Sequence, residues 1–524
     1  MSTRSCLWGG LLLMALLGAS GAHAQDEQAY SALWGKAGEK WDPAGRLPEF
    51  SYAGYRMGEA PIPTPPVKAD VKSFGAKGDG QADDTKAFQE ALKKTSGGAL
   101  SVPAGKYVIT DFLELDKSNT VLRGAGPDKT TLFFPKYLND VKTDWGATTT
   151  GQKTSNYSWQ GGYVVIRGGS GRKVLGKVAA KAKHGEQVIA LDKAPGVRAG
   201  EFVDVRQKDN ADNSLAKHLY SGQSDDVSKL SGSAKTSFIS RVAAVDGMKL
   251  TLERALRTDV DPQWGAEVCE FNPRVTDCGI EDLTFEFPAT PYKGEFTELG
   301  YNPAAIFGAS HCWIRNVRVV NGESGPYLNG TFCTVRGVTF DTDAGRTPDR
   351  TGCIGHHGIT MYGDDNLAED FAFNVKYVHD LTVEHSAGNV FHRGKGVDMC
   401  FDHHKRAPHA NLFTNLDIGE GKRMYRCGGG AALGKNCAAW GTFWDLRAKA
   451  PQKWNANFGP DLMNFVGVET REKPVLDPEG RWWEPIPPAQ LCPQDLYEAQ
   501  LNKRLKKQPA ENPPAARKIT IPLP

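Results

Sequence analysis

Most of the histidines of this chain are concentrated in one segment. Eight of the twelve fall between residues 356 and 409. They are His356, His357, His379, His385, His392, His403, His404 and His409. The run Asp402-His403-His404-Lys405-Arg406 lies within the segment, and five consecutive polar residues cannot all face a packed core. A concentration of ionisable groups marks a candidate site for proton transfer and anion binding. We therefore expect the working surface at residues 356–426.

The polar run predicts two sets of side chains. In a strand, alternation would put Asp402, His404 and Arg406 on one face and His403 and Lys405 on the other, so that one set lines a groove. The candidate catalytic residues are His357, His403, His404, Lys405 and Arg406. The candidate substrate-binding residues are His356, Arg393, Lys395, Arg423 and Arg426. Taken singly, His379, His385, His392 and His409 are better explained as hydrogen-bonded structural residues.

Metal binding is a second chemistry that this segment allows. His356, His357, His403 and His404 could supply nitrogen ligands, and neighbouring aspartates could supply oxygen ligands. Within this segment, no His-x-Glu, Cys-x-x-Cys or His-Glu-x-x-His spacing is present, which argues against zinc. Calcium prefers clustered carboxylates and carbonyls. Asp398 and Asp402 are therefore the candidate metal ligands, and Ca²⁺ is the one cofactor that the sequence suggests.

The N-terminus has the pattern of a secretory signal peptide. Arg4 precedes an apolar run at residues 11–17, and Ala22-His23-Ala24 follows as a small-x-small cleavage site. We expect cleavage before Gln25 and a secreted or periplasmic mature protein. No later stretch has the roughly 20 apolar residues that a membrane-spanning helix needs.

The overall charge is balanced, with 63 Lys and Arg against 61 Asp and Glu. The chain therefore has no global field that would attract nucleic acid or a membrane surface. Any attraction for an anion must be local. Removal of Cys6 with the signal peptide leaves nine of the ten cysteines. This odd number in a long chain does not indicate a disulfide framework, and we expect most of the cysteines to be small core residues.

The first coils have a recognisable order of elements. Asp83-Asp84-Thr85 is placed to cap a helix at residues 87–92, and strands are expected at 99–102 and 107–109 around the turn Pro103-Ala104-Gly105. Arg123-Gly124-Ala125-Gly126 follows. This order, over about residues 69–135, resembles the pectate-lyase-like superfamily with a Pectate-lyase-3-type N-terminal segment. The resemblance implies an all-β fold, a single-stranded right-handed parallel β-helix, and leaves the reaction open.

A repeated pattern supports the same fold independently. The six-residue template apolar-x-x-apolar-x-apolar occurs seven times. Its copies are Ile280/Leu283/Phe285, Ile314/Val317/Val319, Val335/Val338/Phe340, Val378/Leu381/Val383, Phe413/Leu416/Ile418, Phe443/Leu446/Ala448 and Met463/Val466/Val468. The residue before the middle apolar position is mostly Asp or Asn, which suits a turn or an inward polar ladder. Stacked coils that share one core show such self-similarity.

These patterns divide the chain into segments. We expect a signal peptide (1–24), an extended arm (25–68), N-terminal coils with a capping helix (69–184), a small β insertion (185–256), the main coils (257–475), and a C-terminal cap helix and tail (476–524). Residues 493–501 are the expected cap helix.

The residues and the resemblance together favour an enzyme that acts on an acidic polysaccharide. Cleavage of a uronate polymer by β-elimination needs a positive charge at the carboxylate, a base and an acid, and His, Lys and Arg can supply them. A glycoside hydrolase would use paired carboxylates, for which Asp364-Asp365 is the candidate. A non-catalytic sugar-binding or adhesin β-helix is the third reading, with Trp440, Trp444, Trp454, Trp482 and Trp483 as candidate stacking platforms.

Overall fold

The computed structural model describes residues 28–230 and 235–507. The predicted signal peptide and its cleavage site at Ala24 lie outside the described residues. Within the described part, no helix combines the length and apolar character needed to cross a membrane.

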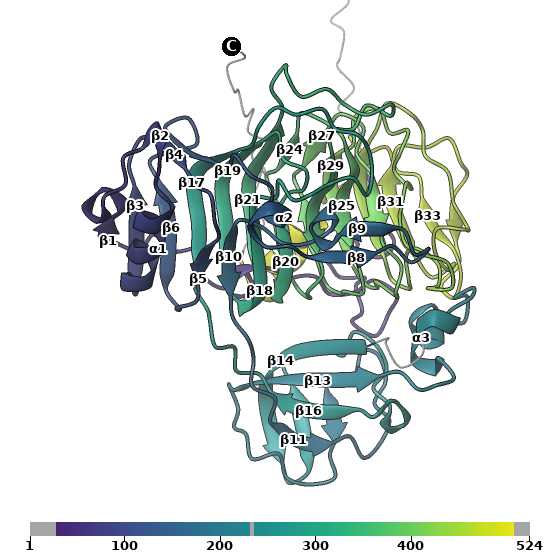
Figure 1. The fold of residues 1–524 in the computed structure, drawn as a ribbon. Helices are drawn as coiled ribbons and strands as arrows, with labels where there is room; N and C mark the ends of the chain where they lie inside the picture. The colour runs from purple at the N-terminus through teal and green to yellow at the C-terminus, as the bar shows by residue number, and fades with distance from the viewer. Residues whose placement is uncertain (1–27, 231–234, 508–524) are drawn as a thin grey trace, which may run out of the picture.

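The body of the molecule is a solenoid in which parallel strands of successive coils pair side by side (Figure 1). Its long sheet contains β1 (Val67–Asp70), β2 (Asp79–Asp83), β3 (Gly98–Val102), β4 (Gly105–Val108), β6 (Thr120–Gly124), β7 (Thr130–Phe133), β17 (Gly279–Glu286), β19 (Trp313–Val320), β21 (Thr334–Asp341), β23 (Leu367–Glu369), β24 (Ala372–Phe373), β26 (Val390–His392), β27 (Lys395–Gly396), β29 (Leu412–Asp417), β30 (Thr442–Arg447), β31 (Asn464–Val468), β32 (Val475–Leu476) and β33 (Trp482–Glu484). The predicted right-handed parallel β-helix is confirmed.

A second, shorter sheet forms another face of the same coils. Its order is β5 (Leu113–Leu115), β10 (Val164–Arg167), β18 (Ala304–Ser310), β20 (Tyr327–Thr331), β22 (Gly355–Met361), β25 (Tyr377–Val383) and β28 (Phe401–His403). Apolar side chains from both sheets fill one continuous core. The histidine-rich segment supplies the last three strands of this shorter sheet.

The repeated template corresponds to ladders of the long sheet. Ile280 pairs with Ile314, and Ile314 with Val335. The polar position before the middle residue bends the strand, because Asp282 and Asn316 have φ of 61° and 51°. Asn and Asp tolerate this left-handed conformation better than other non-glycine residues. Of the two predicted alternatives, a turn or an inward polar ladder, the structure has the turn at this position.

One copy of the template does not belong to these ladders. Val378, Leu381 and Val383 lie on β25 of the shorter sheet. All seven residues of that strand are buried because the strand is covered on both sides. Its apolar spacing therefore matches the template without the bend.

A helix at each end of the chain packs against the coils. α1 (Thr85–Lys94) follows Asp83 and Asp84, and the Asp83 carboxylate accepts a hydrogen bond from the Thr85 amide at 3.0 Å. Buried Phe88 joins the core. α4 (Leu496–Arg504) begins three residues later than predicted, and Asp495 caps it by accepting from the Glu498 amide. Short helices α2 (Leu138–Val141) and α3 (Ser214–Leu219) lie in connections.

The segment from residue 28 to residue 66 is an extended arm along the coils. Ser31 donates to Glu484, and the Phe50 amide donates to Gln500 of α4. Further along, the Tyr55 amide donates to the Thr334 hydroxyl on β21. The arm therefore lies against coils that are hundreds of residues away in the sequence.

The β insertion forms a separate lobe of the molecule (Figure 1). Its six-stranded antiparallel sheet has the order β11 (Val174–Lys177), β16 (Glu267–Glu270), β13 (Phe202–Lys208), β14 (Lys235–Asp246), β15 (Lys249–Leu252) and β12 (Val188–Ala190). The sheet spans more than the predicted 185–256, because β11 and β16 pair with each other at its edge. Buried Arg254 and Arg257 bind Asp365 of the solenoid and hold the lobe in place.

The cysteines of the described residues are all free, and seven of the nine are buried. Cys278, Cys312 and Cys333 belong to the continuous core. They fill small apolar positions between coils, as the sequence predicted.

Candidate functional site

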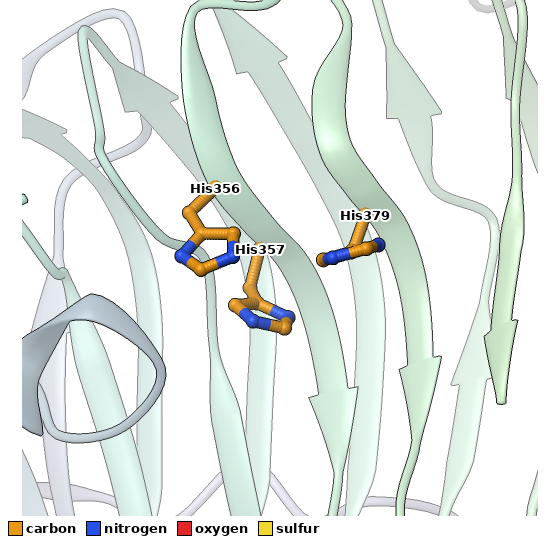
Figure 2. Close-up of side chains that lie close together, drawn as sticks. All are labelled: His356, His357 and His379. Atoms are coloured by element: carbon orange, nitrogen blue, oxygen red, sulfur yellow. The ribbon is translucent and has the colours of Figure 1, made fainter. Parts of the chain in front are cut away.

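Three neighbouring strands bring the histidines of the segment together. His356 and His357 lie on β22, His379 lies on β25, and Asp402 lies on β28. The parallel register aligns His357 with His379, and Thr382 with Asp402. Figure 2 shows the three imidazoles side by side on adjacent strands. Their ring centroids are 4.2 to 5.4 Å apart.

Asp402 and His404 form the best-defined polar pair of the site. The Asp402 carboxylate accepts from His404 Nδ1 at 2.8 Å, and its other oxygen accepts from the Gly428 amide at 2.8 Å. Thr382 donates to the same carboxylate at 3.3 Å. A carboxylate bound to Nδ1 fixes the orientation of the ring and leaves Nε2 free to exchange a proton.

Neighbouring groups shift the pKa values of Asp402 and His404 in opposite directions. Burial alone would raise the pKa of Asp402, but the charges of His379 and His404 outweigh burial and hold that pKa below its usual value. Burial would likewise lower the pKa of His404, but Asp402 outweighs it and raises that pKa. The geometry therefore favours an ionised Asp402 beside a histidine of increased basicity.

The other three histidines differ in their basicity. Burial would lower the pKa of His356, but Glu298 and Glu295, 3.6 and 3.7 Å away, raise it to about 10. Burial and the neighbouring charges lower the pKa of His357. Burial also lowers the pKa of His379 to about 3, against the attraction of Asp402. The cluster thus holds groups that are protonated and groups that are neutral at the same pH.

The site has one partly open side. The His404 side chain is 26% exposed, whereas those of His356 and His379 are at most 3% exposed. Gly428 lies against His404, because a Cβ on Gly428 would come within 2.4 Å of the imidazole. Gly430 approaches Thr149 of the hairpin β8 (Trp145–Ala147) and β9 (Lys153–Ser155) in the same way. The site is therefore covered closely by loops, and His404 is its most accessible imidazole.

Several residues of the site could not be found from the sequence. Glu295 and Glu298 come from a connection that precedes the histidine segment by about 60 residues, and no motif singles them out. Thr382 could have been found only by assuming its register with Asp402.

His403 does not lie with the other candidate catalytic residues. Its side chain is fully buried and packs against Phe413, Phe443 and Phe458. Its Nδ1 bonds to the carbonyl of Phe401. Alternation along the strand places the His403 side chain on the inner face, within the hydrophobic core. A catalytic role for His403 therefore has no support in the geometry.

The predicted alternation ends at His404, because Lys405, Arg406 and Ala407 all have φ near +60°. Arg406 turns to Glu384 and forms an ion pair at 3.0 Å. Within the described part of the chain, Lys405 forms no ion pair, and its stem lies beside Gly429. Arg426 interacts with the charge of Glu295 and likewise forms no ion pair there. Lys405 and Arg426 are thus the cations near this site that are available to an anionic ligand.

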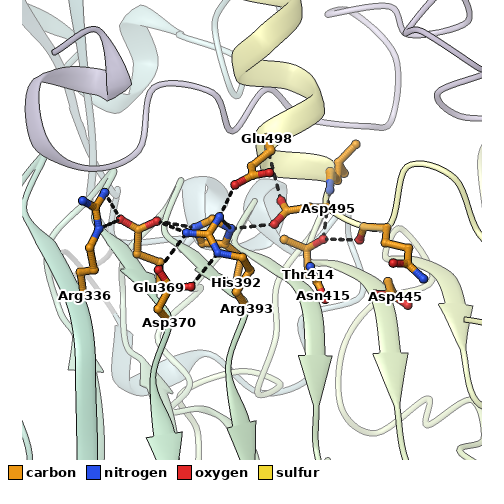
Figure 3. A network of polar contacts seen from close by, with 12 residues as sticks. Arg336, Glu369, Asp370, His392, Arg393, Thr414, Asn415, Asp445, Asp495 and Glu498 are labelled. Carbon is orange, nitrogen blue, oxygen red and sulfur yellow. Dashed lines mark hydrogen bonds and ion pairs between the residues drawn. The ribbon is translucent and has the colours of Figure 1, made fainter. Parts of the chain in front are cut away.

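Three of the predicted substrate-binding residues lie elsewhere. Arg393 is bound by Glu369, Asp370 and Glu498 on the face that α4 covers (Figure 3). Lys395 is exposed on β27 of the long sheet. Arg423 bonds to the carboxylate of Asp380 and to backbone carbonyls. Arg393 and Arg423 are thus structural, because their donors are used to join coils or to dock the helix.

The two predicted calcium ligands are not brought together. Asp398 accepts from the Lys422 amide at 2.8 Å and faces Arg423, whereas Asp402 faces the imidazoles. Among the described residues, the groups with the spacing of a metal site include Asp402 but not Asp398. The site is rich in nitrogen donors, which calcium does not prefer.

The aspartates of the hydrolase hypothesis and the tryptophans of the sugar-binding hypothesis already have partners within the fold. Asp365 is held by two buried arginines, and Asp364 accepts from the Ala387 amide at 2.7 Å. Trp440, Trp444, Trp482 and Trp483 are buried, and Trp454 packs against Phe465 and Arg481. These aspartates and tryptophans therefore have structural partners.

Comparison with known proteins finds a family model that is similar to the first coils. Residues 69–168 match the model described as "Rhamnogalacturonase A/epimerase, pectate lyase-like". This segment is pectate-lyase-like. The match includes the capping helix and the Arg-Gly-x-Gly turn, so the predicted resemblance is confirmed. The pectate-lyase-like segment ends before the histidine cluster begins.

Individual relatives match over short stretches. Alginate lyase 7 of Azotobacter vinelandii is 35% identical over 100 residues, which is 17% of this chain and 12% of that protein. The preneck appendage protein of Bacillus phage PZA is 45% identical over 64 residues, 12% of this chain and 7% of that protein. The chain thus spans about an eighth or less of these relatives.

Among solved structures, the tailspike protein gp49 from Pseudomonas phage LKA1 aligns over 72% of this chain and 63% of its own. The identity is 12% and the TM-score is 0.41. A likeness of this size says nothing about function.

Proposed function

We propose that this protein cleaves a uronate-containing polysaccharide by β-elimination. The observation that carries the proposal is the polarised pair Asp402 and His404, with His404 as the partly exposed member. Lys405 and Arg426 nearby supply positive charge that no carboxylate of the described residues neutralises by an ion pair. An alginate lyase is among the relatives that share the first coils, which agrees with a uronate substrate.

The chemistry follows from these groups. Lys405 and Arg426 would bind the substrate carboxylate and make the proton on the adjacent carbon more acidic. His404 Nε2 would take that proton, while Asp402 stabilises the imidazolium that forms. The electrons of the broken C–H bond form the double bond, and the C–O bond to the leaving sugar breaks. The departing oxygen takes up a proton, and an unsaturated uronate remains at the new end.

A panel of polysaccharides tests the reaction. The purified protein is incubated with alginate, pectate, glucuronan, a heparosan-like polymer and sulfated algal polysaccharides. We expect at least one polymer to yield new reducing ends together with the ultraviolet absorbance of an unsaturated uronate. New reducing ends without that absorbance would show hydrolysis and refute the proposal. Binding without cleavage of any polymer would also refute it and favour the sugar-binding reading.

Two variants test the residue assignment on the polymer that is cleaved. His404→Ala should lower kcat by about 10²- to 10⁴-fold, the usual contribution of a positioned acid or base. Lys395→Ala is the matched control, because Lys395 is exposed on the long sheet and should leave kcat unchanged. A folded His404→Ala protein with full turnover would remove His404 from the mechanism.

A further inference from the structure

His356, His357 and His379 form a compact group of nitrogen donors. Each offers a ring nitrogen, and these atoms lie within 4.8 Å of one another. The strands fix this arrangement, since His357 is in register with His379 and His356 directly precedes His357. All three side chains are buried.

The ring nitrogens of these residues have few partners. Within the described part of the chain, both nitrogens of His356, both of His379 and Nε2 of His357 are buried and form no hydrogen bond. Buried polar atoms are nearly always satisfied, because leaving one without a partner costs free energy. A single shared ligand would take one nitrogen from each ring, three of these five atoms, and the second nitrogens of His356 and His379 would be left facing carboxylates.

The surroundings of the three rings are those of metal-binding histidines. Thr382 Oγ1 lies 3.1 Å from His357 Nδ1, which orients the ring and leaves Nε2 as the donor. Glu298 and Glu295 lie 3.6 and 3.7 Å from the two nitrogens of His356, and Asp402 lies 3.6 Å from His379 Nδ1. Carboxylates and hydroxyls around ligating histidines fix their orientation and increase their basicity. The carboxylates also supply the negative charge that a divalent cation requires, and the cation would replace the proton that Glu298 and Glu295 favour on His356.

We propose that His356, His357 and His379 bind one divalent cation of the late first row, of which Zn²⁺ is the test case. Imidazole nitrogen suits zinc, copper, nickel and iron, whereas calcium and magnesium prefer oxygen. Three histidines leave a coordination position open, as in zinc sites that bind water or substrate. This inference is independent of the proposed lyase activity.

A second group of potential ligands shares one of these residues. His379, Asp402 and His404 also have the required spacing. Asp402 and His404, however, are already hydrogen-bonded to each other. The histidine trio is therefore the better ligand set, and His404, whose ring lies 5.6 Å from that of His379, is its more exposed neighbour.

Metal content can be measured without any substrate. The full-length protein is stripped with a chelator, incubated with ZnCl₂ or CaCl₂, passed through a desalting column and analysed by mass spectrometry for metal per chain. We expect one equivalent of zinc and no calcium. Co²⁺ in place of Zn²⁺ should give the visible absorption of a nitrogen-bound ion of low coordination number. Absence of bound zinc, or stoichiometric calcium in its place, would overturn the proposal.

Variants connect the bound ion to these residues. His357→Ala and His379→Ala should lose stoichiometric zinc and the Co²⁺ absorption. Thr382→Val removes the hydroxyl that orients His357 and that also donates to Asp402, and it should weaken zinc binding by about 10- to 100-fold. His409→Gln changes a buried histidine outside the trio and should bind zinc as the parent does. Unchanged binding in folded Thr382→Val and His379→Ala proteins would refute the assignment. If either alanine variant does not fold, a zinc titration of the Thr382→Val protein still tests the assignment of the ligands.

Discussion

At the scale of single residues, the basicity of His404 depends on its hydrogen bond to Asp402. Asp402 is buried and receives the Gly428 amide as well, so its carboxylate is held in place. An asparagine at this position has nearly the same shape but no charge. The exchange therefore separates the electrostatic effect of Asp402 from its packing.

Asp402→Asn should change the pH dependence of catalysis. Asp402 raises the pKa of His404, so a base at this position becomes active only as the pH rises through that raised value. Without the carboxylate, the pKa of His404 falls, and the acidic limb of kcat/KM should move to lower pH while its plateau drops by about 10²-fold. Steady-state kinetics over a pH series measure both effects.

Asp398→Asn is the control, because Asp398 faces Arg423 and the Lys422 amide outside the histidine cluster. Its acidic limb should coincide with that of the parent. An unmoved limb in Asp402→Asn would show that another group acts as the base.

The sequence indicated the segment of the site but not all of its members. The density of His, Lys and Arg pointed to residues 356–426, and His356, His357, Asp402 and His404 do lie together. His403 could not be separated from His404 by composition, since the inner face of β28 depends on the packing of neighbouring coils. The sequence also could not show that Arg393 is structural, because its partner Glu498 lies on α4, more than a hundred residues away.

At the scale of elements, the bend before the middle apolar residue is repeated along the long sheet. Asn415 and Asp445 have the same left-handed φ as Asp282 and Asn316. Asn316 also donates to Asp282 of the preceding coil at 2.6 Å. The polar residues therefore serve both the strand that they bend and the contact between coils.

Substitutions at Asn316 should separate these two roles. Asn316→Gly keeps access to the left-handed conformation and loses only an exposed hydrogen bond, so we expect a small effect on stability. Asn316→Val places a β-branched residue at positive φ and should destabilise the protein by about 1–3 kcal/mol. The midpoint of urea unfolding measures the difference. Thr339→Val on β21 introduces the same residue outside these left-handed positions and should change the midpoint little. Equal midpoints for the two Asn316 variants would contradict the role of the bend.

The strands could be predicted because their apolar spacing repeats, and the capping helices because their polar caps are local. The edges of the insertion could not be predicted, because β11 and β16 pair across almost a hundred residues. The covering hairpin β8 and β9 was also missed. Its short strands carry no apolar alternation, and most of that hairpin is exposed.

At the scale of the whole molecule, a charged network docks the C-terminal helix onto the coils. His392 lies between Glu369 and Asp495, with ring nitrogens 3.1 and 2.8 Å from their carboxylates (Figure 3). Burial would lower the pKa of His392, but Asp495 outweighs it and, with Glu369, raises that pKa to about 9. The contacts of His392 with Glu369 and Asp495 therefore depend on the proton of this buried imidazole.

This network predicts a loss of stability at alkaline pH. The pKa of His392 is raised on folding, so its contribution is complete below the unfolded value of about 6.5 and is lost as the pH rises through about 9. The contribution is on the order of 3 kcal/mol. His392→Gln should lower Tm at pH 6 and remove much of the decline between pH 7 and pH 10.

His409→Gln is the control for this experiment. The pKa of His409 is lowered by burial to about 3, so its contribution is lost as the pH falls rather than as it rises. That variant should keep the alkaline decline of the parent. The same decline in His392→Gln would show that other groups cause it.

The N-terminal arm also constrains how the molecule is completed. Ser31 and Phe50, near the start of the described chain, bond to Glu484 and Gln500, near its end. These two hydrogen bonds can form only after almost the whole chain has been made. Most of the coils could therefore stack before these two contacts of the arm are made. A chain truncated before α4 would lose the contact of Phe50 with Gln500, so we expect this part of the arm to be more open to proteases.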